Sequence, residues 1–225
     1  MKSVIQYGKK SQQKQTKGTK RNSPFVSFVS FCSNSSLSVK FVIQLFCFLL
    51  LAATAAQAQF TFVVNPGNTT VTITGYTGDG VAVSIPAATN GMQVTGIGGD
   101  AFLDCEDLAG ITIPGSVTNI GVGAFDQCAG LTNVSMTNGV ISIGADAFEY
   151  CASLASITIP ASVTNIGGQA FEACGSLAGV YFKGDAPAAI SSAFLSDNKA
   201  TIYYMPGATG WKSIYARRPT VPWKP

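Results

Sequence analysis

The chain has 225 residues, of which 47% are hydrophobic and only 11% charged, so it can bury a core of its own. The formal net charge of +3 hides a segregation, because residues 1–40 hold eight of the fourteen bases and no acid. From residue 59 onward, six bases stand against all eleven acids, a net charge of −5. This balance excludes a basic protein that binds nucleic acid or an acidic membrane surface.

The first segment, residues 1–58, is predicted to be a leader and signal peptide. An uncharged apolar run at 41–56 follows Lys40 and leads into Ala56-Gln57-Ala58, a pattern typical of secretory cleavage. We predict cleavage after Ala58 and a secreted or cell-surface protein. A membrane anchor is the disfavoured alternative, because the apolar run at 41–56 is shorter than the about 20 residues that a bilayer span needs. After cleavage, no stable membrane span would remain. Translation is expected to start near Val39, with residues 1–38 a start-site artefact.

Residues 59–82 are expected to form a β-hairpin that caps the first repeat. Two alternating stretches, 60–64 and 70–74, flank Asn65-Pro66-Gly67-Asn68, whose residue types favour a turn. A cap is needed because an exposed strand edge invites aggregation.

A repeat occupies residues 83–206. The pair Ala-Phe returns every 23 residues, at 101–102, 124–125, 147–148, 170–171 and 193–194. An apolar column keeps the same step through Ile111, Val134, Ile157, Val180 and Tyr203. Val83 starts this column, with an insertion of five residues before the phase resumes. A fixed period of this length predicts a solenoid.

Each unit contains an alternating I-x-I, typical of a short strand, and Pro then ends the strand because it cannot donate to a ladder. In V-x-x-I-G, the Gly permits a bend or a positive φ. A unit of 23 residues cannot close a core alone, so units must stack and their strands must pair in parallel, about 4.8 Å apart.

The stretch 111–128, ITIPGSVTNIGVGAFDQC, contains every part of this repeat pattern. It closely resembles the BspA-type leucine-rich repeat of bacterial surface proteins. The resemblance covers about residues 83–206 and implies a secreted or surface binding scaffold, often adhesive. The expected fold class is a β-rich α/β solenoid, a right-handed leucine-rich-repeat coil with a parallel strand face and capped ends. Ser116, Gly139 and Ser162 depart from the family pattern, because an Asn ladder would be expected there.

Each of four successive repeats ends in a cysteine, namely Cys105, Cys128, Cys151 and Cys174. A zinc site is poorly supported because the first and last of them would lie about 14 Å apart, three strand spacings. We expect a ladder of small buried thiols. One or two disulfides between adjacent coils are the alternative, since export implies an oxidising compartment.

The Ala-Phe turn is expected to carry both core and surface residues. Four aromatic residues are expected to have a structural role by packing between the coils: Phe102, Phe125, Phe148 and Phe171. An acidic column follows three of them, at Asp126, Glu149 and Glu172. We interpret it as a solvated outer face, with a weak cation site as the alternative. No metal ion or other cofactor is expected.

The outward strand face is the candidate binding surface. Its row begins with small hydroxyl side chains and ends with aromatic ones; the candidates are Thr112, Ser135, Thr158, Tyr181, Tyr204 and Trp211. Aromatic side chains are frequent anchors of binding surfaces. The equal alternative is that Tyr181 and Tyr204 shield the last repeats beneath a cap.

Residues 207–225 are expected to form an aromatic C-terminal cap and tail. Residues 183–225 hold six bases and two acids, whereas residues 59–182 hold nine acids and no base. This asymmetry favours a solubilising acidic surface with an unrelated basic tail. Weak head-to-tail self-association is the alternative.

The chain contains no histidine, which removes the commonest general base and every Ser-His-Asp triad. We therefore expect no enzyme. The predicted protein is an exported binding module that presents its strand face to a protein or a glycan, in the manner of an adhesin. A structural component of the cell envelope without a discrete ligand is the alternative.

Overall fold

The computed structural model describes residues 59–189, 191–196 and 199–223. The chain divides into two compact units, residues 1–51 and 52–225, and every described residue lies in the second. The predicted signal peptide and its cleavage after Ala58 lie outside the described residues. In the described part of the chain, no helix is long and apolar enough to cross a membrane.

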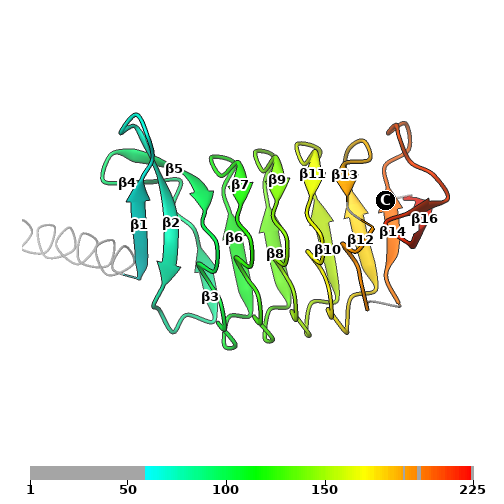
Figure 1. The fold of residues 1–225 in the computed structure, drawn as a ribbon, viewed down its shortest axis with the longest axis horizontal. Coiled ribbons are helices and arrows are strands. Elements are labelled where there is room, and N and C mark those ends of the chain that lie inside the picture. The colour runs from blue at the N-terminus through cyan, green and yellow to red at the C-terminus, as the bar shows by residue number, and fades with distance from the viewer. Residues whose placement is uncertain (1–58, 190, 197–198, 224–225) are drawn as a thin grey trace, which may run out of the picture. The chain divides into compact units, whose positions relative to one another are not determined.

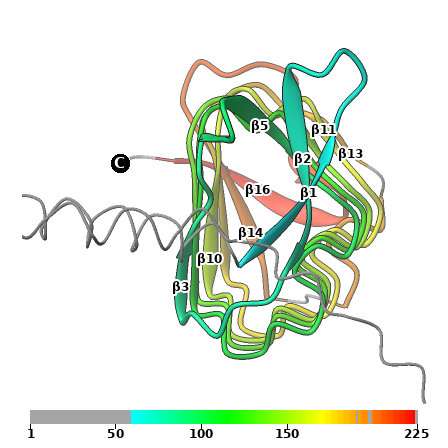
Figure 2. The same cartoon turned by 90° about the vertical axis from the view of Figure 1, so that its left-hand side faces the viewer.

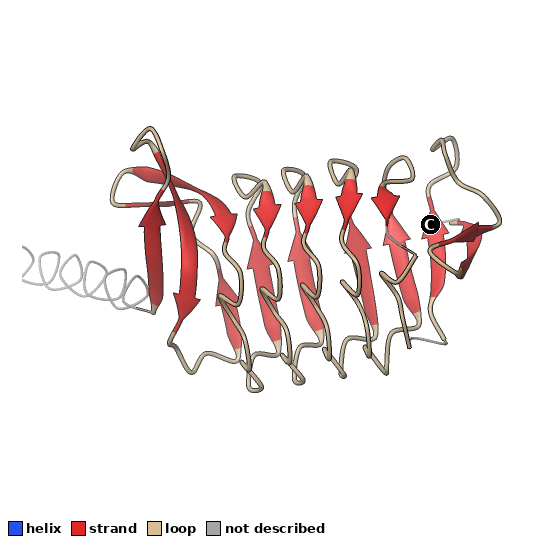
Figure 3. Cartoon of the chain, viewed as in Figure 1, coloured by secondary structure: helices blue, strands red, loops and turns tan. Residues whose placement is uncertain are grey.

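The described residues form strands and turns and contain no helix (Figure 3). The α/β part of the expected fold class is therefore not confirmed. The strands are β1 (Phe60–Val64), β2 (Thr70–Tyr76), β3 (Ala82–Ser84), β4 (Ala88–Thr89), β5 (Met92–Ile97), β6 (Gly110–Ile113), β7 (Asn119–Ile120), β8 (Asn133–Met136), β9 (Ser142–Ile143), β10 (Ser156–Ile159), β11 (Asn165–Ile166), β12 (Gly179–Phe182), β13 (Ala188–Ala189), β14 (Thr201–Tyr204), β15 (Ile214–Tyr215) and β16 (Arg218–Pro222).

Successive coils stack into a β-solenoid, and they superpose in the view along the stack (Figures 1 and 2). One face consists of a sheet β3-β6-β8 followed by a sheet β10-β12-β14-β16-β15. A second face carries the order β1-β2-β5-β7-β9-β11-β13, with β4 beside β5, and its strands from β7 to β13 have two residues each. From β5 to β13 every pair in this second sheet is parallel, as the repeat predicts.

The register confirms the 23-residue step in the body of the solenoid. Ile111 pairs with Val134 on the first face. On the second face, Ile120 pairs with Ile143. The predicted five-residue insertion is also confirmed, because Val83 pairs with Ile111, 28 residues away. Strand β4 lies inside this insertion and pairs antiparallel with β5.

A column of stacked rings fills the centre of the Ala-Phe turns. Successive rings of Phe102, Phe125, Phe148, Phe171 and Phe194 lie 4.8, 5.1, 5.4 and 5.2 Å apart between centroids. Each of these side chains is at most 1% exposed, and full burial of a Phe contributes about 1.5–3 kcal/mol. Tyr76 of β2 extends the column, stacking on Phe102 at 5.2 Å.

The Gly after the second Ile has a different role from the one predicted. Gly121, Gly144 and Gly167 have no positive φ. A Cβ on Gly144 would lie 2.6 Å from the carbonyl carbon of Gly121 in the preceding coil. Gly is therefore required here because the backbones of adjacent coils nearly touch, and a bend with positive φ is not its reason.

The Ala-Phe turns of neighbouring coils are linked by a ladder of backbone hydrogen bonds, which the sequence pattern does not predict. The N–H groups of Gly123, Phe125 and Gln127 donate to carbonyls of the next coil at 2.8–2.9 Å. In such a turn two residues four positions apart adopt left-handed φ, as Asp146 at 57° and Tyr150 at 53° do. The donors are alternate residues of the turn, and on this face each coil donates to its C-terminal neighbour.

Candidate functional site

Four hydroxyl side chains form a row across the first face. The register places Ser84 beside Thr112 and Thr112 beside Ser135, and the first three residues of the row are exposed while Thr158 of β10 is half-buried. Their neighbours along each strand are buried core residues, such as Ile111 and Ile113. This alternation turns the polar side chains outward and holds them on a rigid sheet.

The end of the row differs from the prediction by one residue. The step from Val180 to Ile202 is 22 residues, and Tyr181 therefore pairs with Tyr203. The prediction placed Tyr204 in the outward row and Tyr203 in the inward column, and the structure exchanges them. The cause is one residue fewer between the last Ala-Phe turn and β14, a change that two adjacent Tyr residues conceal because either can occupy either face.

Tyr204 belongs to an aromatic cluster under the C-terminal segment. Its ring stacks on Trp211 with centroids 5.1 Å apart. Trp211 also packs against Phe182 at 4.8 Å, and its indole N–H donates to the Gly184 carbonyl at 3.2 Å. Two of the predicted binding side chains, Tyr204 and Trp211, thus have their rings and the indole N–H engaged within the protein.

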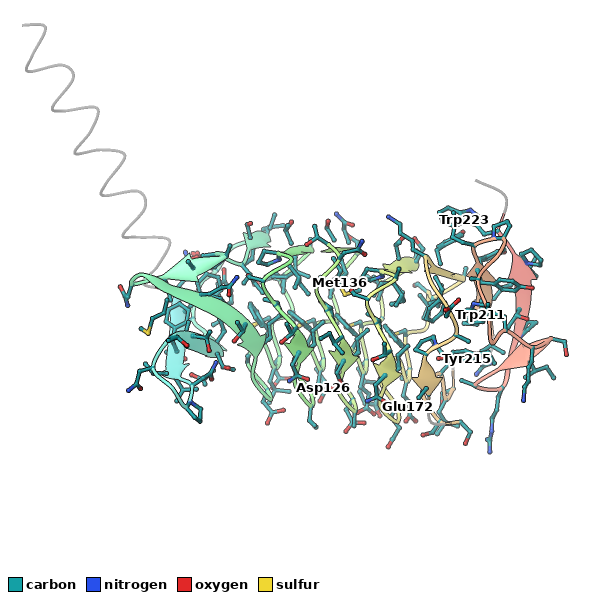
Figure 4. All side chains as sticks on the ribbon, turned by 90° about the horizontal axis from the view of Figure 1, so that it is seen from above. Asp126, Met136, Glu172, Trp211, Tyr215 and Trp223 are labelled. Atoms are coloured by element: carbon teal, nitrogen blue, oxygen red, sulfur yellow. The ribbon has the colours of Figure 1, made fainter. Side chains whose placement is uncertain are left out.

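Tyr181 and Tyr203 continue the row as a stacked pair, with centroids 4.8 Å apart. The Tyr181 ring also lies over Gly179, where an added Cβ would meet it at 2.8 Å. Trp223, which was not predicted as a site residue, lies against Tyr181 at 5.2 Å. Figure 4 shows Trp211, Tyr215 and Trp223 gathered at the C-terminal end of the stack. The regular 23-residue step leads from Tyr181 to Tyr204, so the sequence pattern contained no signal for Tyr203.

The acidic column lies on the Ala-Phe turn face, with Asp126 and Glu172 on the same long side of the stack (Figure 4). Burial raises the pKa of the Asp126 carboxyl, and Asp104 and Asp146 add to the rise, against hydrogen bonding from Gln127. Burial likewise raises the pKa of Glu149, with neighbouring acids adding to it. In the part of the chain that the structure describes, no three acids or thiols converge in a way that could hold a metal ion.

The cysteines form the expected column and bond to the backbone. The Sγ atoms of Cys128, Cys151 and Cys174 donate to Phe carbonyls of the preceding coil at 3.1, 3.3 and 3.0 Å. Cys105, Cys128 and Cys151 carry free thiols in this structure, and burial raises the pKa of Cys151 to about 12. Such thiols are structural, since the reactive form is the thiolate.

Cys105 is the exception in the column because it is only partly buried. It lines a depression of about 360 Å³ beside Tyr76 and the acidic residues Asp79, Asp104 and Glu106. A hydrogen bond with Cys128 lowers the pKa of Cys105, against the opposing effects of burial and Asp104. The first thiol of the ladder is thus the most accessible one.

The sequence pattern of the BspA type leucine rich repeat region matches residues 84–209 in six copies. The chain belongs to this family. The resemblance seen in the repeat is therefore confirmed, and the coils described above are BspA-type repeats. No curated protein matches the chain.

Solved structures of bacterial leucine-rich repeat proteins resemble this BspA-type chain. A T. pallidum leucine rich repeat protein (TpLRR) is 31% identical, with a TM-score of 0.60 over 65% of this chain and 69% of that one. A protein from Bacteroides capillosus is 33% identical, with a TM-score of 0.51 over 56% of this chain and 95% of that one. A leucine rich cell surface protein from Faecalibacterium prausnitzii is 30% identical, with a TM-score of 0.55, and the match covers 67% of this chain and 44% of that one.

Proposed function

We propose that the protein is an exported, non-enzymatic binding module, which presents its first face to a protein or a glycan in the manner of an adhesin. The observation that carries the proposal is the outward row on that face. Ser84, Thr112 and Ser135 are exposed, lie on three paired strands and alternate with buried core residues. A rigid face with solvent-facing hydroxyl groups can bind a partner without paying to order a loop.

Two further findings support export and surface location. The A-x-A motif after the apolar run predicts removal of residues 1–58. The similar protein from Faecalibacterium prausnitzii is named as a cell surface protein. Leucine-rich repeats as a class suggest protein interaction, and the absence of histidine from the whole sequence argues against the commonest acid–base catalysis.

Binding is tested by retention on an array of matrix proteins and surface glycans. The wild type should be retained on one class of ligand. Ser135→Lys places a long cation in the middle of the row and should reduce retention at least about tenfold, a loss of about 1.4 kcal/mol. Ser153→Lys is the matched control, because Ser153 is also exposed but lies in the turn after Cys151, and it should bind as the wild type does.

Equal retention of the two variants would show that this face is not the binding surface. A protein retained by nothing on the array, yet recovered with the envelope fraction of the producing cell, would favour the structural role instead.

A further inference from the structure

The two ends of the solenoid are not protected equally. Strand β1 is the terminal strand of its sheet, and within the described residues it pairs only with β2 (Figure 1). At the opposite end, the same sheet terminates in β13, which has only two residues. The sheet of the first face terminates there in β15, which also has two residues and is flanked by Lys212 and Arg217. Short length and flanking charge are the usual protections of a sheet edge, and β1 has neither.

The free edge of β1 offers backbone groups to a partner. The Asn65 N–H donates to the Thr70 carbonyl at 2.9 Å, so Asn65 and Thr70 form a hydrogen-bonded pair. Hydrogen-bonded and non-hydrogen-bonded pairs alternate along an antiparallel ladder. Val64 pairs with Val71 one position earlier, so its own N–H and C=O point away from β2. The side chains of Val63 and Val64 are 50% and 46% exposed, which leaves the edge apolar as well as unpaired.

No charged side chain lies on this edge. Residues 59–78 contain no Lys, Arg, Asp or Glu, and β1 itself contains no Pro. The hairpin is also held in place, because the Asn65 amide donates to Thr70 Oγ1 at 2.9 Å and to Thr95 Oγ1 at 3.2 Å. The edge is therefore preorganised for a further strand.

We propose that β1 pairs antiparallel with β1 of a second copy of this chain, forming a two-fold symmetric dimer. An identical strand is a suitable partner because two antiparallel copies present the same residues to each other and close the interface in one step. Residues 79–182 carry nine acids and no base, so copies repel one another side by side. The end without charged side chains is where two copies can approach.

A five-residue strand pair is small beside the roughly 1,600 Å² of a standard stable interface. The dimer therefore dissociates in the micromolar range, roughly 1–100 µM. Head-to-tail association is disfavoured, because it would have to join β1 to a strand of only two residues, β13 or β15.

The experiment is sedimentation velocity on the protein recovered from the producing cell, with its N-terminus determined by mass spectrometry. Between about 1 and 300 µM, the wild type should pass from monomer to dimer and stop there. Val64→Lys should raise the dissociation constant at least about tenfold, because two cations and their hydration would enter the strand pair. Val122→Lys, at a valine 56% exposed on another coil, should leave dimerisation unchanged.

Hydrogen exchange supplies a readout that does not depend on how well a variant folds. In the wild type, the Val64 amide should become protected as concentration rises through the dimerisation range. The Asn65 amide, which bonds within the hairpin, should be protected at all concentrations. A monomer throughout the range, growth to species larger than a dimer, or a Val64 amide indifferent to concentration would each overturn the proposal.

Discussion

At the scale of single residues, the spacing between coils is set by glycine rather than by large side chains. Gly121, Gly144 and Gly167 lie where the backbone of one coil meets that of the preceding one. The rings of the Phe column are spaced at 4.8–5.4 Å, close to the strand spacing of about 4.8 Å. Core stacking and ladder bonds therefore agree only if no side chain separates the backbones at these glycines.

Gly144→Ala tests this role. The added Cβ would lie 2.6 Å from the Gly121 carbonyl carbon, so the two coils must move apart and lose ladder bonds. We expect a loss of about 1–3 kcal/mol in the free energy of unfolding, measured by urea denaturation. Gly175→Ala is the control, because its Cβ would meet nothing within 4 Å; its midpoint should not fall.

The sequence predicts a residue's position correctly where its 23-residue period and its side-chain chemistry both indicate the same environment. The Ile and Phe columns recur at a constant step and have only one suitable environment, the core. Tyr203 and Tyr204 were exchanged because a Tyr ring suits either face, so a one-residue change of step leaves no mark in the pattern. The left-handed φ of Tyr150 and Ala173 was not predictable either, since neither residue type favours that conformation.

At the scale of elements, the last Ala-Phe turn is completed by β16 rather than by another repeat. In the body of the solenoid, a Phe carbonyl accepts a hydrogen bond from the Cys thiol of the next coil, as Phe102 does from Cys128. The Phe194 carbonyl has no such coil after it. Arg218 of β16 reaches back and donates to that carbonyl through Nη2, so a guanidinium takes the place of the thiol.

Arg218→Ala should therefore loosen the C-terminal end. Hydrogen bonds to charged groups contribute about 1.5–3 kcal/mol, and we expect a loss in that range together with faster hydrogen exchange in β14 and β16. Arg217→Ala removes the same charge from the neighbouring residue, which is exposed, and should change stability by less than about 0.5 kcal/mol. Equal effects of the two changes would mean that net charge, and not the bond to Phe194, is responsible.

At the scale of the whole molecule, stability is a sum over neighbouring coils. Strands in the body of the stack pair with the preceding and following coils, as β7 pairs with β5 and β9. Energetics of this kind depend on each repeat and on each interface between repeats. The hairpin and the C-terminal segment are the parts without a second copy, so the number of middle coils can vary while the ends cannot.

Removal of one whole coil tests this view. Deletion of residues 123–145 removes one period of 23 residues and joins Val122 to Asp146. Phe102 then stacks on Phe148, and Ile120 meets Ile166, so each column receives a side chain of its own kind. We expect a cooperatively folded protein with an unchanged β-type circular dichroism spectrum per residue and a lower melting temperature, because one interface is lost. Deletion of residues 123–140, which breaks the period, puts core columns opposite surface positions, and this variant should fail to fold; if it folds as well as the first, the period does not define the unit of assembly.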